Sequence, residues 1–181
     1  MTMRILSRRD TLLLGAGLLT SGCGYALAGR GNSLPASIRT IGVPPFVNQS
    51  STPEIDIVLT DAVRAEFQTK GRYRILPDAT GVNAVMLGRV LNVMLQPATF
   101  TEQNQVSRYL IIAVASIEFR EEPGPRVIWA NPSFQVRDEF DVTTGQSATD
   151  ANALFSQDAN ALDRLARSFA RSVVTSIFEA F

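Results

Sequence analysis

Residues that alternate between apolar and polar predict three long consecutive strands in this chain. The predicted segments are 84–96, 107–120 and 127–142. The middle segment is apolar at its odd positions from Tyr109 to Phe119, and its even positions add Leu110, Ile112 and Val114. A strand that is apolar on both faces is usually central in a sheet or covered on each side. Two shorter extended pieces are predicted at Ile38–Val43 and Tyr73–Leu76.

The two flanking long segments each have two distinct faces. In 84–96, alternation along the strand predicts two apolar faces. One face carries Met86, Val90 and Met94. The other carries Val85, Leu87, Leu91, Val93 and Leu95. In 127–142, Phe134, Val136, Phe140 and Val142 face one way, whereas Gln135, Arg137, Glu139 and Asp141 face water.

Apolar residues at steps of three or four predict two helices. The first opens at Pro53, with Ser51 or Thr52 as its cap, and ends at Lys70–Gly71. The second spans Asp158–Phe181, after a polar, small-residue loop at 143–156 with helical potential toward its end. The residues expected to pack these helices on the sheet are Leu59, Phe67, Leu165 and Phe169.

The order of these elements predicts an α+β fold. A strand, a helix, three long strands and a final helix are expected to form a single domain, 37–181. In it, two helices pack on one face of a mixed, roughly four-stranded sheet. Because the middle strand is apolar on both faces and the helices cover only one face of the sheet, the other face has apolar surface that something else must cover. Either a protein partner covers it, or loops and the N-terminal segment do so.

The N-terminus has the charge and hydropathy pattern of an export signal. Arg4, Arg8 and Arg9 precede an apolar run at 12–19, and small residues follow up to Gly22. This pattern is typical of a secretory signal peptide, and the run is too short to span a bilayer permanently. We therefore expect residues 1–22 to be removed. Ser7–Leu12 also resembles a twin-arginine signal, so two export routes stay open.

Cys23, the only cysteine of the chain, directly follows these small residues. Its position resembles the lipobox of bacterial lipoproteins, in which the cysteine is acylated, for instance with palmitate, and becomes the mature N-terminus. Thr20 stands where that motif usually has leucine. The alternative is a buried free thiol. Gly24, in place of an aspartate, favours the outer membrane, and residues 23–36 are expected to form a lipid-anchored tether.

The composition gives no support to an enzyme or to a nucleic-acid-binding protein. Histidine is absent, which removes the commonest general base and metal ligand. With 14 basic and 16 acidic residues after the signal, the domain is nearly neutral and has no basic footprint for nucleic acid. The grouped carboxylates at 121–122 and 138–141 lie in a turn and along a strand. We expect no catalytic residue, no metal and no cofactor.

An ordered set of short motifs resembles the lipopolysaccharide-assembly lipoprotein family, LptE. The set begins at Cys23-Gly24-Tyr25 and covers essentially the whole chain after the signal. Its later members are Leu27, Gly29, Leu34-Pro35, Ile38–Pro44, Lys70–Tyr73, Val127–Asn131, Arg137–Phe140 and the final helix through Phe181.

The resemblance implies a two-helix, four-strand sandwich. It also implies an outer-membrane lipoprotein that plugs and assists assembly of the LptD β-barrel, which inserts lipopolysaccharide into the outer leaflet. Its domain would lie on the periplasmic side and inside the barrel. Some family members contact the lipid through basic residues near the turn after the first long strand and in the loop before the last helix. Here 101–106 and 143–163 contain neither lysine nor arginine.

The candidate contact residues lie around the turn between the first two long strands. Thr101, Glu102 and Gln103 are polar and suit the polar lumen of a large barrel. Arg108, the first cation after this turn, is a candidate for bidentate hydrogen bonds to a barrel carboxylate or a lipopolysaccharide phosphate. Arg89 and Arg137 are further candidates, although an arginine on a strand is often just a solvated surface residue.

A second function stays open at this point. The chain could be a periplasm-facing envelope lipoprotein that scaffolds a protein complex without binding lipopolysaccharide. A small lipoprotein hydrolase is a third class, against which the absence of histidine argues.

Overall fold

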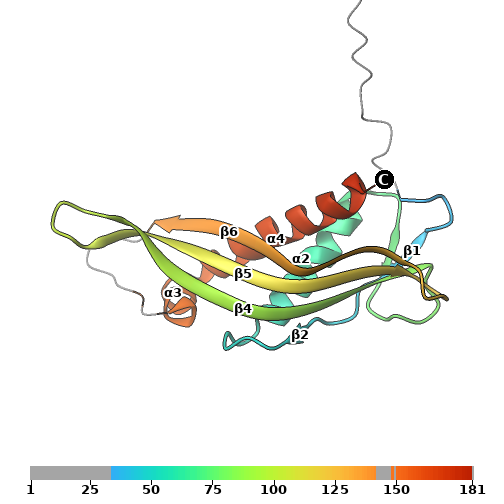
Figure 1. The fold of residues 1–181 in the computed structure, drawn as a ribbon, viewed down its shortest axis with the longest axis horizontal. Coiled ribbons are helices and arrows are strands. Elements are labelled where there is room, and N and C mark those ends of the chain that lie inside the picture. The colour runs from blue at the N-terminus through green and yellow to red at the C-terminus, as the bar shows by residue number, and fades with distance from the viewer. Residues whose placement is uncertain (1–33, 142–147, 149, 181) are drawn as a thin grey trace, which may run out of the picture. The chain divides into compact units, whose positions relative to one another are not determined.

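One mixed sheet organises the part of the chain that the computed structural model describes, residues 34–141, 148 and 150–180. The signal peptide expected at 1–22, Cys23 and the expected strand end at Val142 lie outside the described residues. The strands are β1 (Thr40–Gly42), β2 (Val47–Asn48), β3 (Arg74–Leu76), β4 (Ala84–Phe100), β5 (Val106–Glu121) and β6 (Val127–Asp141) (Figure 1).

The strand order is β3-β1-β4-β5-β6, with β2 beside β4. The short strands pair in parallel, β1 with β3 and β4, and β2 with β4, whereas β4, β5 and β6 form an antiparallel meander. The mixed α+β class is therefore confirmed, and the sheet has six strands where about four were expected. Tyr73–Leu76 was predicted to be extended but was not counted as a strand of the sheet, and it forms β3. Val47–Asn48 was missed because two residues are too few to show alternation.

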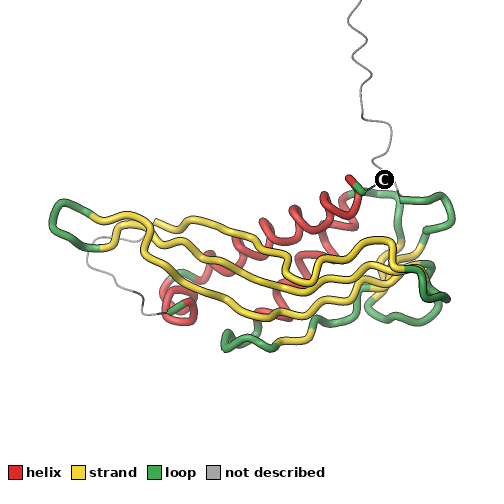
Figure 2. The backbone as a smooth tube through the Cα atoms, in the orientation of Figure 1, coloured by secondary structure: helices red, strands yellow, loops and turns green. Residues whose placement is uncertain are grey.

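The helices are α2 (Ile55–Thr69), α3 (Ala151–Gln157) and α4 (Ala159–Glu179) (Figure 2). The two long ones, α2 and α4, pack against each other and on the same face of the sheet, as predicted. Asp158 caps α4 by accepting a hydrogen bond from the Asn160 N–H at 2.9 Å. The short α3 lies where a loop with helical potential was expected, and Asp150 caps it in the same way.

The start of α2 differs from the prediction. The cap position is Glu54, which has a left-handed backbone (φ 60°) and makes no side-chain cap hydrogen bond. Ser51 and Thr52 lie in the preceding turn, where the Asn48 amide donates to the Thr52 carbonyl at 2.8 Å and the Ser50 hydroxyl accepts from the Thr52 N–H. This local network, built around Asn48, replaces the expected Ser/Thr cap.

A continuous apolar core joins the helices to one face of the sheet. Leu59, Phe67, Leu165 and Phe169 are fully buried in it, which confirms the predicted packing residues. The odd-numbered apolar residues of β5 face the same core. Leu34, within the expected tether, is also buried there.

A β-bulge at Leu91 reverses the faces of β4. Its register with β5 shifts between Val90 and Asn92. Met86 and Val90 therefore share the core face with Val93 and Leu95, while Met94 lies on the opposite face. The strict alternation expected for 84–96 is wrong beyond Val90, because one extra residue in a strand inverts every following side chain.

We predict that Phe169→Ala lowers the free energy of unfolding by roughly 3–5 kcal/mol, because it removes a fully buried ring and leaves a cavity. Urea unfolding measures the change. Phe100→Ala is the matched control: the Phe100 ring is 54% exposed, so its loss is expected to change stability little. Equal midpoints for Phe169→Ala and the unmodified protein would contradict this description of the core.

Candidate functional site

The turn between β4 and β5 is a hydrogen-bonded hairpin end. The Thr101 N–H donates to the Gln105 carbonyl at 2.8 Å, and the Asn104 N–H donates to the Thr101 carbonyl at 2.9 Å. The Gln105 N–H also reaches the Thr101 hydroxyl at 3.2 Å. Asn104 has a left-handed backbone (φ 58°), which asparagine tolerates. The turn therefore has a defined shape.

The outer end of this hairpin projects beyond α3 and α4 (Figure 1). Glu102 and Gln103 are exposed at the turn, and the Phe100 ring beside them is half exposed. Glu102 is the single charged residue between Phe100 and Val106. This end thus presents polar groups, one negative charge and one aromatic ring.

Arg108 lies on β5 near the hairpin end and binds two carboxylates of its own chain. Its Nε donates to Asp141 Oδ1 at 2.7 Å, and its Nη1 donates to Glu139 Oε2 at 3.1 Å. The hydrogen bond to Asp141 and the charges of Asp141 and Glu139 raise the pKa of Arg108. Arg108, Asp141 and Glu139 together carry one positive and two negative charges. The guanidinium is therefore already neutralised and does not attract a further anion.

The three arginines predicted as contact residues share the helix-free face of the sheet. Register places Arg89 opposite Ser116, Arg108 opposite Asp141 and Arg137 opposite Ile112, all on the face away from the core. Arg89 and Arg137 are exposed and form no ion pair with the described residues. The structure thus brings the predicted cations to one face but spreads them over its length.

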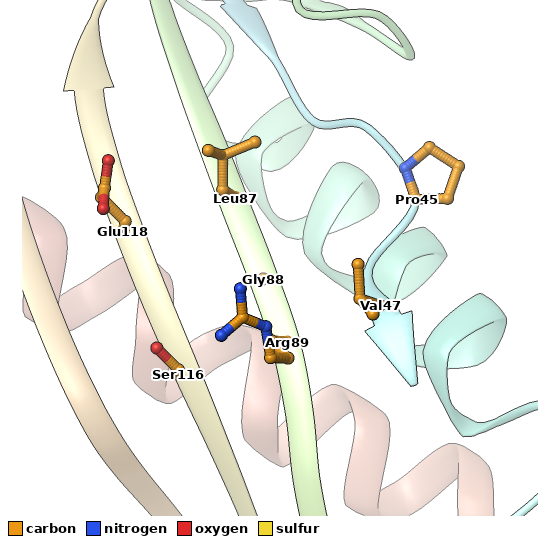
Figure 3. Close-up of a pocket in the computed structure, with 7 residues that line it drawn as sticks. All are labelled: Pro45, Val47, Leu87, Gly88, Arg89, Ser116 and Glu118. Atoms are coloured by element: carbon orange, nitrogen blue, oxygen red, sulfur yellow. The ribbon is translucent and has the colours of Figure 1, made fainter. Parts of the chain in front are cut away.

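Arg89 lines a shallow hollow of about 230 Å³ on this face, where β2 joins β4. Figure 3 shows the Arg89 and Ser116 side chains from neighbouring strands, with Pro45 and Val47 at the β2 side. Glu118 lines the hollow as well and also lies 3.8 Å from Arg120. The hollow is therefore mixed in charge.

An apolar strip runs along the centre of the same face. Leu110 and Val114 of β5 and Met94 of β4 are half-buried there, and Ile112 is buried mainly by its sheet neighbours. None of these four belongs to the core between the sheet and the helices, and the described helices lie on the other face. In the sequence, the apolar even-numbered residues of β5, Leu110, Ile112 and Val114, predict this strip.

The outer edge of β6 is partly closed by its own side chains. The Ser133 N–H donates to Asn131 Oδ1 and the Glu139 N–H to Asp138 Oδ1, both at 3.0 Å. The other Asp138 oxygen accepts from Ser168 of α4 at 2.9 Å. Pro132 has no N–H to donate. Capped donors interrupt the ladder that an added strand would need, so the face of the sheet is better suited than this edge to meet a partner.

The carboxylates considered for acid–base chemistry are engaged with arginines at the surface. Glu139 and Asp141 bind Arg108, and Glu121 lies 3.2 Å from Arg126. Exposed, arginine-paired carboxylates along strands are an ordinary surface arrangement.

Among the described helices, none combines the length and the hydropathy needed to cross a membrane.

Fold and surface together define a two-layer α+β protein with one sheet face free of helices. The sequence matches the family model for lipopolysaccharide assembly, LptE, over residues 38–177. This chain therefore belongs to the LptE family, as its motifs predicted. No curated protein sequence matches it.

Three solved structures are similar to this chain at low sequence identity, and the first of them shares its fold. An uncharacterised lipoprotein B from Nitrosomonas europaea has a TM-score of 0.51 at 9% identity, over 86% of this chain and 90% of that chain. A hypothetical protein from Chlamydia trachomatis has a TM-score of 0.49 at 8% identity, over 77% and 98% of the two chains. A minor lipoprotein from Acinetobacter baumannii has a TM-score of 0.47 at 11% identity, over 81% and 94%.

Proposed function

We propose that this protein is an outer-membrane lipoprotein that occupies the lumen of an LptD-type β-barrel, assists its assembly and takes part in delivering lipopolysaccharide to the outer leaflet. Family membership over 38–177 is the observation that carries this proposal. The proposed role is non-catalytic. Cys23 would supply the lipid anchor, and the domain would face the periplasm and enter the barrel from that side.

The projecting β4–β5 hairpin supports a plug. Its end is polar and carries one charge, Glu102, which suits the polar interior of a large barrel better than lipid tails. Its hydrogen-bonded turn costs little conformational entropy to dock because it is already ordered. Thr101, Glu102 and Gln103 are the residues of this turn that would touch the barrel wall.

The helix-free face supports a second contact with the barrel. Its apolar strip would lose water on contact, and Arg89 and Arg137 are available for carboxylates of the wall. Arg108 is a different case, because a new anion must displace Asp141 or Glu139 from its guanidinium. We propose that Arg108 mainly holds β5 to β6 and contacts the partner as part of this ion-pair group.

The scaffold alternative draws on one observation. The hairpin end has no lysine or arginine between 101 and 106, and Arg108 is already paired. A protein that binds other envelope proteins without touching lipopolysaccharide would need no free cation there. Co-purification of a large β-barrel with the chain separates the plug from this alternative.

We predict that mature protein from envelopes starts at Cys23 and carries a diacylglycerol group, usually with a third acyl chain. Intact mass of the native protein measures this. A Cys23→Ser variant exported with another signal should remain soluble in the periplasm, because the lipid supplies most of the membrane affinity. An unmodified Cys23, or a mature chain that starts elsewhere, would refute the anchor.

We predict that a photocrosslinking residue placed at positions 101, 102 or 103 captures the barrel in intact cells. Position 171 on α4 is a matched control for positions 102 and 103, because Arg171 is exposed like them but lies on the helix layer. Gel shifts followed by mass spectrometry identify the partner. If the protein co-purifies with the barrel but 101–103 give no crosslink, the interface lies elsewhere. Normal barrel folding and normal surface lipopolysaccharide after depletion would reject the function itself.

A further inference from the structure

A cluster of arginines surrounds the point where the chain enters the domain. The N–H of Leu34, the first described residue, donates to the Tyr73 hydroxyl at 3.1 Å, and Leu34 is buried. Leu34 and Tyr73 line a shallow surface hollow together with Arg39 and Arg72. Arg74 lies next to them, because its N–H donates to the Arg39 carbonyl at 2.9 Å. We call Arg39, Arg72 and Arg74 the entry patch.

The fold itself assembles the entry patch from two distant segments. Arg39 directly precedes β1, while Arg72 and Arg74 lie just before and at the start of β3. The parallel register of Thr40 with Arg74 brings the two strand starts together at the same end of the sheet. In the sequence, Arg39 is more than thirty positions away from Arg72 and Arg74.

The entry patch is not neutralised by its surroundings. All three arginines are exposed, and none forms an ion pair with the described residues. The nearby Lys70 is paired with Glu66 at 3.4 Å and lies over the Phe178 ring. Glu179 follows Phe178, which packs against Tyr73. Glu122 is also near Arg39, because its N–H donates to the carbonyl of Asn83, whose side chain accepts from the Arg39 N–H. Glu122 lies 3.8 Å from Arg120, and its neighbour Glu121 lies 3.2 Å from Arg126, so each of these carboxylates already has another arginine beside it.

The length of chain before Leu34 limits how far the entry patch can lie from a lipid anchor. Leu34 is eleven positions after Cys23, and a fully extended chain of that length spans at most about 40 Å. If Cys23 is lipidated, as the proposed function holds, the patch stays within this distance of the headgroups. The tether keeps the local lipid concentration high, so even a weak contact would be well populated.

We propose that the entry patch docks on anionic phospholipid headgroups of the leaflet that holds the anchor. Exposed guanidinium groups bind phosphates through paired hydrogen bonds, and several cations near an anionic surface act together. The hairpin end lies at the far end of β4 from Ala84, which pairs with β1, roughly 50 Å along the strand. Headgroup contact at one end therefore leaves the hairpin free to enter a barrel.

The test is cosedimentation with lipid vesicles of the mature chain, residues 23–181 carrying Cys23→Ser and exported with another signal, so that neither the anchor nor the signal peptide contributes. Vesicles of phosphatidylcholine alone are compared with vesicles that also contain phosphatidylglycerol, at low and high salt. We expect binding only to the anionic vesicles, weakened by salt because screening shortens the reach of surface charges. Arg39→Gln with Arg72→Gln should weaken it about thirtyfold, or roughly fivefold for each arginine.

The matched control is Arg167→Gln with Arg171→Gln, which removes the same charge from the exposed side of α4. Thermal unfolding checks that both double variants remain folded. The control should bind like the parent. Equal losses in the two double variants, a loss in the control alone, or no parent binding to anionic vesicles would each overturn the proposal. A third vesicle set of phosphatidylcholine with lipopolysaccharide completes the test, and binding confined to that set would also overturn the proposal. The Cys23 mass and the barrel crosslinks report on the proposed function independently.

Discussion

The packing of Phe169 is the contact on which the rest of the structure depends. Its ring meets Phe46 edge-on at 6.5 Å and Phe134 at 5.8 Å between centroids, so it joins α4 to the segment before β2 and to β6. Phe46 in turn lies directly over Gly88, where any side chain would collide with its ring. These contacts hold α4 on one face of the sheet, α2 packs beside α4 on the same face, and no described helix covers the opposite face.

One-sided packing explains why the surface is divided as it is. The helix layer takes the apolar residues of one face into the core, whereas the strip around Ile112 and Val114 stays on the face that no described helix covers. The hairpin end and the arginines of β4 and β6 belong to this face or border it. The entry patch lies at the other end of the sheet, next to the start of the domain. The proposed partner contact and the proposed membrane contact therefore lie at different ends of one sheet.

Local patterns in the sequence predict the long elements well and the short or non-local ones poorly. The stripes through Phe67 and Phe169 and the two-faced β5 follow from periodicity, and the helix stop at Gly71 has the expected left-handed backbone. The bulge at Leu91 could not be predicted, because the residue that β4 loops out depends on its register with β5. The pairing of Arg108 with Asp141, 33 positions away, and the assembly of the entry patch depend on strand order.

Amide hydrogen exchange, compared between the isolated full chain and the complex purified with its barrel, tests the central claim most directly. If the hairpin end lies inside the barrel, the amides at 101–105 should exchange at least about tenfold more slowly in the complex, where contact excludes water. Exchange in α2 should stay the same. Protection confined to α2 and α4, with the hairpin end unchanged, would contradict the account.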